Sequence, residues 1–330
     1  MKSGATWTTS YSAILARIKK MTPLVKSEAI PRELFSQDIG TLAASALRDE
    51  AWAGPKPGLV DRFDSGAHTD MDLETFYRSA EVLEGYFQGM YERGFESRLE
   101  SLAPKAAFGA ARKIGLQAES AMFEATGGVN THKGAIFSLG LVATAAGYRN
   151  AQRLSPSWRS RNAPEPREIL HCAAEMVRGI VSRELAVPLT EKKQRPLTAG
   201  EKLYYHYGVS GIRGEAEAGF PAVLTVSLPL LQSLRQYGII DLDSIAQHLL
   251  LHLILVVEDS TVLSRGGYPA LRHLRIWAAE ALRRGGVLSR EGRRFIEAMN
   301  RDCNDRGISC GGSADLLALS LFLDRLLAAI

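Results

Sequence analysis

The sequence predicts an all-α protein, because apolar residues recur at three- and four-residue steps and the alternation typical of strands is nearly absent. The 72–93 segment shows the pattern, since one face of a helix there would carry Leu73, Phe76, Tyr77, Ala80, Leu83, Tyr86 and Phe87. We expect a single multi-helix globular domain over 36–330, with glycine-rich interhelical loops that form the site. An N-terminal extension, partly flexible, is expected over 1–35.

The same periodicity places the individual helices. They are expected over 31–49, 72–93, 104–124, 132–150, 165–185, 221–237, 241–257, 268–284, 288–302 and 313–329. The 135–146 segment is apolar on every side, which predicts a position in the centre of the domain. The proline-rich stretch 155–166 and the polar break 191–196 resemble linkers, but neither is expected to be a domain boundary.

Composition is ordinary for a soluble globular chain of 330 residues, with 46% apolar and 23% charged residues. The formal charge of +4 is too small to indicate nucleic acid. Three cysteines without a CxxC pair argue against a disulfide framework or a zinc site and favour a cytoplasmic protein. The longest apolar run, 249–257, is too short to span a bilayer. Residues 1–27 lack acids, which weakly resembles a transit peptide, although a basic tail is the preferred interpretation.

The segment TGGVNTHKG, Thr126–Gly134, has the composition of an anion-binding loop. Glycines let backbone approach a ligand, the N-terminus of the following helix favours phosphate, and Lys133 adds a positive charge. The spacing is not that of a Walker A loop. A second interpretation is a glycine-broken loop between helices, with Thr131 as the N-cap. The segment alone does not separate the two.

The segment GPKPGLVDRFDSGAHTDMD, 54–72, brings four acids together, namely Asp61, Asp64, Asp70 and Asp72. Such oxygen ligands suit Mg²⁺, which uses one or two carboxylates together with substrate phosphates. Alternatively, Thr69 and Asp72 form a capping box, or Asp70 is itself an N-cap. Capping is preferred for Asp72, and metal binding or proton transfer for Asp70.

Two cations in these loops are candidate phosphate contacts. Pro55 and Pro57 are expected to present Lys56 rather than bury it; otherwise Lys56 is a solvated surface lysine. Arg213 lies among glycines at every third position and has the fork geometry that phosphate oxygens accept. The acids that follow Arg213 make an ion pair the competing interpretation.

Two further loops carry charge at helix ends. Glu258 and Asp259 follow the apolar 241–257 helix, where buried carboxylates require a cation such as Lys, Arg or Mg²⁺. An internal ion pair with Arg265 is the alternative. In the last loop, Ser313 is the expected N-cap of the C-terminal helix.

Five motifs together resemble the triphosphoribosyl-dephospho-CoA synthases. In order along the chain they are PKPGLVDRFDSGAHTDMD, ATGGVNTHKGAIFSLGL, YGVSGIRGEAEAGFPAV, EDSTVLSRGG and GGSADLLA. The resemblance runs from about residue 40 to the C-terminus. Cys310 occupies a position where Pro is expected, which bears on redox sensitivity.

The resemblance implies a reaction in which the 2′-hydroxyl of 3′-dephospho-CoA attacks C1′ of the ATP ribose, adenine leaves, and the triphosphate stays on the transferred sugar. The product is the precursor of the acyl-carrier prosthetic group of malonate decarboxylase or citrate lyase. A downstream transferase would load it onto an acyl carrier protein. Nucleic acid and membrane partners are not expected, and a homo-oligomer is possible. Another Mg²⁺-dependent nucleotide transferase, such as a phosphotransferase, is the alternative.

The resemblance also suggests roles for the residues. The substrate-binding set is Lys56, Gly127, Gly128, Asn130, Thr131, His132, Lys133, Arg213 and Arg265, of which Lys133, the 127–131 backbone, Arg213 and Lys56 would contact the triphosphate. The catalytic set is Asp70, His68, Glu258 and Asp259, with Asp70 and Asp259 as Mg²⁺ ligands. A carboxylate would accept the proton of the attacking hydroxyl and stabilise an oxocarbenium-like centre. His68 or His132 would donate to the leaving adenine.

Overall fold

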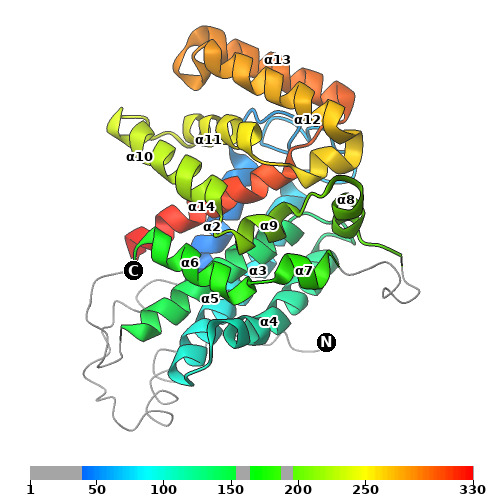
Figure 1. Ribbon diagram of the computed structural model, residues 1–330. Coiled ribbons are helices and arrows are strands. Elements are labelled where there is room, and N and C mark those ends of the chain that lie inside the picture. The colour runs from blue at the N-terminus through cyan, green and yellow to red at the C-terminus, as the bar shows by residue number, and fades with distance from the viewer. Residues whose placement is uncertain (1–38, 154–163, 187–195, 330) are drawn as a thin grey trace. The chain divides into compact units, whose positions relative to one another are not determined.

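The computed structural model describes residues 39–153, 164–186 and 196–329. Over these ranges the structure is helical and contains no strand, which confirms the all-α class (Figure 1). The expected N-terminal extension, the beginning of the 31–49 helix and most of the 155–166 and 191–196 stretches lie outside the described residues.

The described chain forms two compact units that interleave along the sequence. The first unit contains 39–46, 78–177 and 322–329, and the second contains 47–77 and 178–321. Three of the four boundaries between them fall inside helices, which are α2 (Ile39–Trp52), α3 (Leu73–Leu99) and α14 (Gly311–Ala329).

Helix α5 (Lys133–Gln152) is the core of the first unit, where it packs against α4 (Pro104–Ala125) and α6 (Pro166–Val177) (Figure 1). Nearly every residue from Ala135 to Ala151 is buried, as the apolar pattern predicts. Helix α3 approaches α5 so closely that only glycine fits at the crossing. A Cβ on Gly94 would lie 2.0 Å from the Thr144 carbonyl oxygen, and one on Gly147 would lie 2.0 Å from that of Tyr91.

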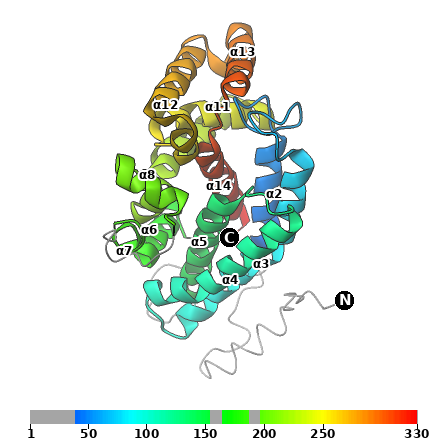
Figure 2. The same cartoon turned by 90° about the vertical axis from the view of Figure 1, so that its right-hand side faces the viewer.

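The second unit consists of shorter helices around α11 (Leu242–Val256) and α12 (Ser260–Arg283), which pack against each other. The remaining elements are α7 (Ile180–Glu184), α8 (Ala199–Tyr207), α9 (Gly211–Glu217), the π-helix η3 (Val223–Ser227), α10 (Leu228–Gln236), the 3₁₀-helix η4 (Gly286–Leu288) and α13 (Arg290–Arg306). Figure 2 shows the 53–72 loop beside α11 and α13, to which it is hydrogen-bonded.

Glycines explain where the expected helices were wrong. The predicted 165–185 helix is two helices, because Gly179 adopts a left-handed conformation with φ 76°. The predicted 268–284 helix instead begins at Ser260 and kinks at Gly267. The glycine-rich segment around Arg213, expected to be a loop, contains the short helix α9 (Gly211–Glu217).

Among the described helices, no single one has both the length and the apolar character needed to cross a membrane. Helix α11 and the segment Ser260–Leu288 meet those criteria only as a pair bent by 61°.

Candidate functional site

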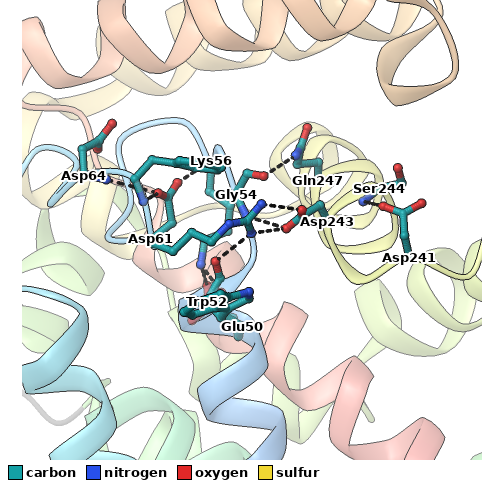
Figure 3. Close-up of polar contacts among 12 residues, drawn as sticks. Glu50, Trp52, Gly54, Lys56, Asp61, Asp64, Asp241, Asp243, Ser244 and Gln247 are labelled. Atoms are coloured by element: carbon teal, nitrogen blue, oxygen red, sulfur yellow. Dashed lines mark hydrogen bonds and ion pairs between the residues drawn. The ribbon is translucent and has the colours of Figure 1, made fainter.

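The 54–72 loop of the second unit is held in shape by its own acids (Figure 3). The Asp61 carboxylate accepts hydrogen bonds from the backbone N–H groups of Lys56 (2.8 Å) and Phe63 (2.7 Å). Gly54 lies so close that a Cβ there would be 2.5 Å from Asp61 Oδ2. Burial raises the pKa of Asp61, while these N–H bonds oppose that shift. Asp61 is therefore a scaffold residue of the loop.

Two other acids of the loop have structural roles as well. Asp64 accepts hydrogen bonds from the α13 side chains of Asn300 (3.0 Å) and Asn304 (3.3 Å), which tie the loop to that helix. Asp72 caps α3 by accepting from the Thr75 N–H (2.9 Å) and hydroxyl (2.6 Å). Capping by Asp72 is confirmed, but Asp72 is itself the N-cap, so the expected Thr69 capping box and the alternative Asp70 cap are both wrong.

Lys56 is buried, contrary to the expectation that the flanking prolines present it. Its side chain is 0% exposed, and Nζ lies 2.7 Å from Glu50 Oε1 and also donates to the Glu50 carbonyl (Figure 3). The charge of this buried ammonium is compensated by Glu50, and none of its N–H donors faces solvent. The loop is joined to α11 by Arg62, whose Nη2 lies 2.6 Å from Asp243 Oδ2.

The fourth acid, Asp70, belongs to a different arrangement, the His68 cluster, which consists of His68, Asp70, Arg265 and Ser309. The Asp70 side chain is 61% exposed, and its Oδ1 lies 3.6 Å from Nδ1 of the mostly buried His68. Arg265 Nη2 lies 3.2 Å from the same Nδ1, and Ser309 Oγ lies 2.9 Å from Nε2. Because arginine only donates, Nδ1 accepts from Arg265 and the Nε2 proton points to Ser309.

The electrostatics of this cluster keep His68 neutral at pH 7. Burial lowers the pKa of His68, and the Arg265 guanidinium lowers it further, while Asp70 acts in the opposite direction. Arg265 also donates to the carbonyls of Ala67 (3.2 Å) and Gly307 (3.4 Å). The alternative in which Arg265 pairs with Glu258 or Asp259 is therefore wrong.

Asp259 is buried and joins the starts of two helices. Its Oδ1 accepts from the N–H groups of Thr261 (2.9 Å), Val262 (3.2 Å) and Gly312 (3.2 Å), and its Oδ2 accepts from the N–H (2.7 Å) and hydroxyl (2.8 Å) of Ser313. Backbone donors, rather than the expected cation, therefore compensate this carboxylate. Burial raises the pKa of Asp259 against these bonds.

The same contacts correct the expected cap of α14. The helix begins at Gly311, so Ser313 lies inside its first turn and is not the N-cap. By contrast, the neighbouring Glu258 is exposed and accepts a hydrogen bond from the Tyr268 hydroxyl at 3.3 Å. Cys310, just before α14, is fully buried, and burial raises the pKa of its thiol well above the usual range, which disfavours the reactive thiolate.

Arg213 forms an ion pair, as one interpretation predicted, but with a partner distant in sequence. Its Nε lies 2.8 Å from Glu184 Oε2. The two acids that follow it serve the backbone: Glu215 accepts from the Ala222 N–H, and Glu217 accepts from the Val181 N–H at 3.0 Å. The Arg213 side chain remains partly exposed.

The Thr126–Gly134 loop lies in the first unit, between α4 and α5. Gly127 and Gly128 have positive φ angles of 67° and 91°, and the Gly128 N–H donates to the Phe123 carbonyl at 2.7 Å. These glycines end α4, as the helix-cap interpretation predicts. A side chain at either position would meet open space, so glycine is not needed there to make room for a ligand.

The beginning of α5 differs from that interpretation. His132 is the N-cap residue and its side chain forms no capping bond, whereas Thr131, the expected cap, donates to Ser79 Oγ at 2.8 Å. Asn130 Oδ1 accepts from the Lys133 N–H at 3.3 Å. Lys133 is 51% exposed and its Nζ lies 2.9 Å from Glu119 Oε2. An accessible ammonium thus stands at a helix N-terminus, where an anion is favoured.

The structure groups the predicted residues within each unit. In the second unit it brings together His68, Asp70 and Arg265, to which sequence reasoning failed to add Ser309. In the first unit it brings together Asn130–Lys133, to which Ser79 and Glu119 must be added. Ser79 had a signal, since it is a hydroxyl beside the apolar face of the 72–93 pattern. The described residues contain no group of three or more His, Cys, Asp or Glu side chains arranged to hold a metal ion.

Comparison with protein families found one whose description is ATP:dephospho-CoA triphosphoribosyl transferase, matching residues 36–329. The match therefore includes both compact units and every residue of the candidate site. No solved structure matched the chain significantly.

Proposed function

The chain belongs to the ATP:dephospho-CoA triphosphoribosyl transferase family, and from this membership we propose the details of its reaction. The protein is a transferase that moves the triphosphoribosyl group of ATP to dephospho-CoA. In our proposal the 2′-hydroxyl of 3′-dephospho-CoA attacks C1′ of the ATP ribose. The C1′–N bond to adenine breaks, a C1′–O bond forms, and the product is 2′-(5″-triphosphoribosyl)-3′-dephospho-CoA. The hydroxyl proton passes to a carboxylate, which returns it to solvent, and the departing adenine takes up one proton from solvent, so that no net proton is gained or lost.

The triphosphate needs cations and N–H donors that are accessible. Lys133, at the N-terminus of α5, and Arg265, in the His68 cluster, have exposed side chains. Arg213 is partly exposed. In the first unit, we propose that Lys133 and the Asn130–His132 backbone bind the phosphates. Arg213 and Arg265 are the candidate phosphate contacts of the second unit. Lys133 must then exchange Glu119 for a phosphate oxygen. Lys56 is not included, because its ammonium is buried against Glu50.

Magnesium is part of the proposal, since ATP normally binds as its Mg²⁺ complex. Asp70 and Glu258 are the exposed acids among the predicted ones, whereas both oxygens of Asp259 already accept hydrogen bonds. A Mg²⁺ ion that keeps several waters and takes one or two carboxylates with substrate phosphates fits such a donor set. The bound ion would neutralise part of the triphosphate charge.

In our proposal an acid accepts the hydroxyl proton and a histidine interacts with the leaving adenine. Asp70, whose carboxylate is exposed beside His68, is our candidate for the group that accepts the hydroxyl proton. Neutral His68 is a donor of hydrogen bonds rather than of full protons, and its Nε2 proton is directed to Ser309. We therefore propose that His132 donates to the adenine ring.

The observation that carries the function is the family match across residues 36–329. The test is to incubate the protein with ATP, Mg²⁺ and 3′-dephospho-CoA and to separate the products by chromatography. Free adenine that appears only when dephospho-CoA is present supports the proposal. Release of ADP instead would indicate a phosphotransferase and would contradict it.

We further propose that the protein acts in the cytoplasm and supplies its product to a transferase that loads an acyl carrier protein. The client is either malonate decarboxylase or citrate lyase. Assembly into a homo-oligomer is an additional expectation, which the molar mass in solution will test.

A further inference from the structure

Ser79 connects α3 to the Thr126–Gly134 loop inside the first unit. Its side chain is 0% exposed, and its Oγ lies 2.7 Å from Nδ1 of His132. The same oxygen accepts the hydroxyl proton of Thr131 at 2.8 Å. Two consecutive residues of the loop are therefore held by one buried hydroxyl of another helix.

The tautomer of His132 sets the direction of its hydrogen bond with Ser79. A serine hydroxyl has a single proton. Because Ser79 accepts from Thr131, its own proton is available for Nδ1 of His132. When Ser79 donates that proton to Nδ1, Nδ1 is the acceptor and a neutral His132 ring carries its proton on Nε2.

We propose that Ser79 is a positioning residue, which fixes the His132 tautomer and the path of the loop just before α5 and so prepares the loop to bind the triphosphate of ATP. The inference rests on the proposed function of this loop. The need for such an anchor is visible in the loop itself, since Gly127 and Gly128 have open space around them and the N-cap His132 makes no capping bond. Without the anchor, binding an anion would require the loop to be ordered first, which weakens affinity.

The chain offers a matched control on the same helix. Ser97 is also on α3 and 0% exposed, but its hydroxyl has no hydrogen-bond partner among the described residues. Ser79→Ala and Ser97→Ala therefore remove the same atom from equally buried positions, and only the first breaks contacts with the loop.

The experiment measures the His132 tautomer by ¹⁵N NMR and the affinity for inorganic tripolyphosphate by calorimetry, alongside KM and kcat. His132→Gln assigns the NMR signals. We expect Ser79→Ala to weaken tripolyphosphate binding by about three- to tenfold, to raise KM for ATP and to mix the His132 tautomers. Ser97→Ala should leave all three at wild-type values. Thr131→Val, which keeps the Ser79–His132 bond, should retain the tautomer and serves as the second variant if Ser79→Ala does not fold.

The two proposals fail in distinguishable ways. If wild-type protein releases adenine while Ser79→Ala keeps the wild-type tautomer and tripolyphosphate affinity, the positioning role is overturned and the function stands. If Ser79→Ala changes both while wild-type protein releases no adenine, the positioning role stands and the proposed function is overturned. A Thr131→Val variant with mixed tautomers would also overturn the assigned hydrogen-bond direction.

Discussion

Replacing Lys56 by methionine should destabilise the fold rather than weaken substrate binding. The ammonium is fully buried and lies 2.7 Å from the carboxylate of Glu50, which is itself only 5% exposed. Methionine keeps most of the volume but leaves Glu50 as a buried charge without a partner. Removing one member of such a pair typically costs about 3–5 kcal/mol in the free energy of unfolding. For a chain of 330 residues, with an unfolding entropy of about 2.1 cal/mol/K per residue, that loss corresponds to a fall in Tm of roughly 4–7 °C.

Urea unfolding followed by circular dichroism measures the effect in Lys56→Met, Glu50→Gln and the double variant. The double variant should recover part of the loss, because it removes both buried charges. Lys133→Met is the control: its lysine is exposed, so the free energy of unfolding should change by less than about 1 kcal/mol, while affinity for triphosphate falls. The reasoning is refuted if Lys56→Met unfolds like the wild type and raises KM for ATP, since Lys56 would then contact the ligand.

Three other substitutions test separate parts of the structure. Asp259→Asn should lower the free energy of unfolding by about 2–4 kcal/mol in urea, because an amide NH₂ would face backbone donors at the starts of α12 and α14; an unchanged midpoint would contradict the double-cap role. Burial lowers the pKa of His248 to about 4, with His252 as a smaller cause, so between pH 6.5 and 4 the unfolded chain binds a proton that the folded chain does not. Stability should therefore fall as pH drops through this window, by up to about 3 kcal/mol, and His248→Leu should flatten the profile; an equal slope in both proteins would exclude His248 as the cause. Asp70→Asn should reduce turnover or Mg²⁺ dependence at wild-type stability, whereas Asp61→Asn should destabilise the loop, and full activity of Asp70→Asn would remove Asp70 from the mechanism.

Helix periodicity is a local property, which is why the sequence predicted the all-α class and the buried position of α5. The positions at which helices are interrupted were harder to predict, because a glycine inside a helical pattern is compatible with a continuous helix or with an interruption. Gly179 interrupts the predicted 165–185 helix by taking φ 76°, and Gly267 kinks α12 with φ 63°. Both choices depend on the tertiary surroundings rather than on spacing.

The site was predicted less completely, since sequence locates polar loops but not the directions of their side chains. The acids of the 54–72 loop look equivalent in sequence. In the structure Asp61 accepts from backbone N–H groups that an irregular loop must satisfy, and Asp64 accepts from the amides of Asn300 and Asn304 on α13. Asp70 is instead exposed with its carboxylate beside His68. The burial of Lys56 depends on Glu50, six residues before it, and the spacing of the prolines carries no information about that contact.

The most direct test of the central claim follows both ends of ATP in one reaction. ATP labelled with ¹⁴C in adenine and ³²P in the γ-phosphate is incubated with the protein, Mg²⁺ and 3′-dephospho-CoA. The account predicts equal amounts of free labelled adenine and of a dephospho-CoA product that carries the ³²P label. A product that retains ¹⁴C, or ³²P transferred without release of adenine, would contradict triphosphoribosyl transfer.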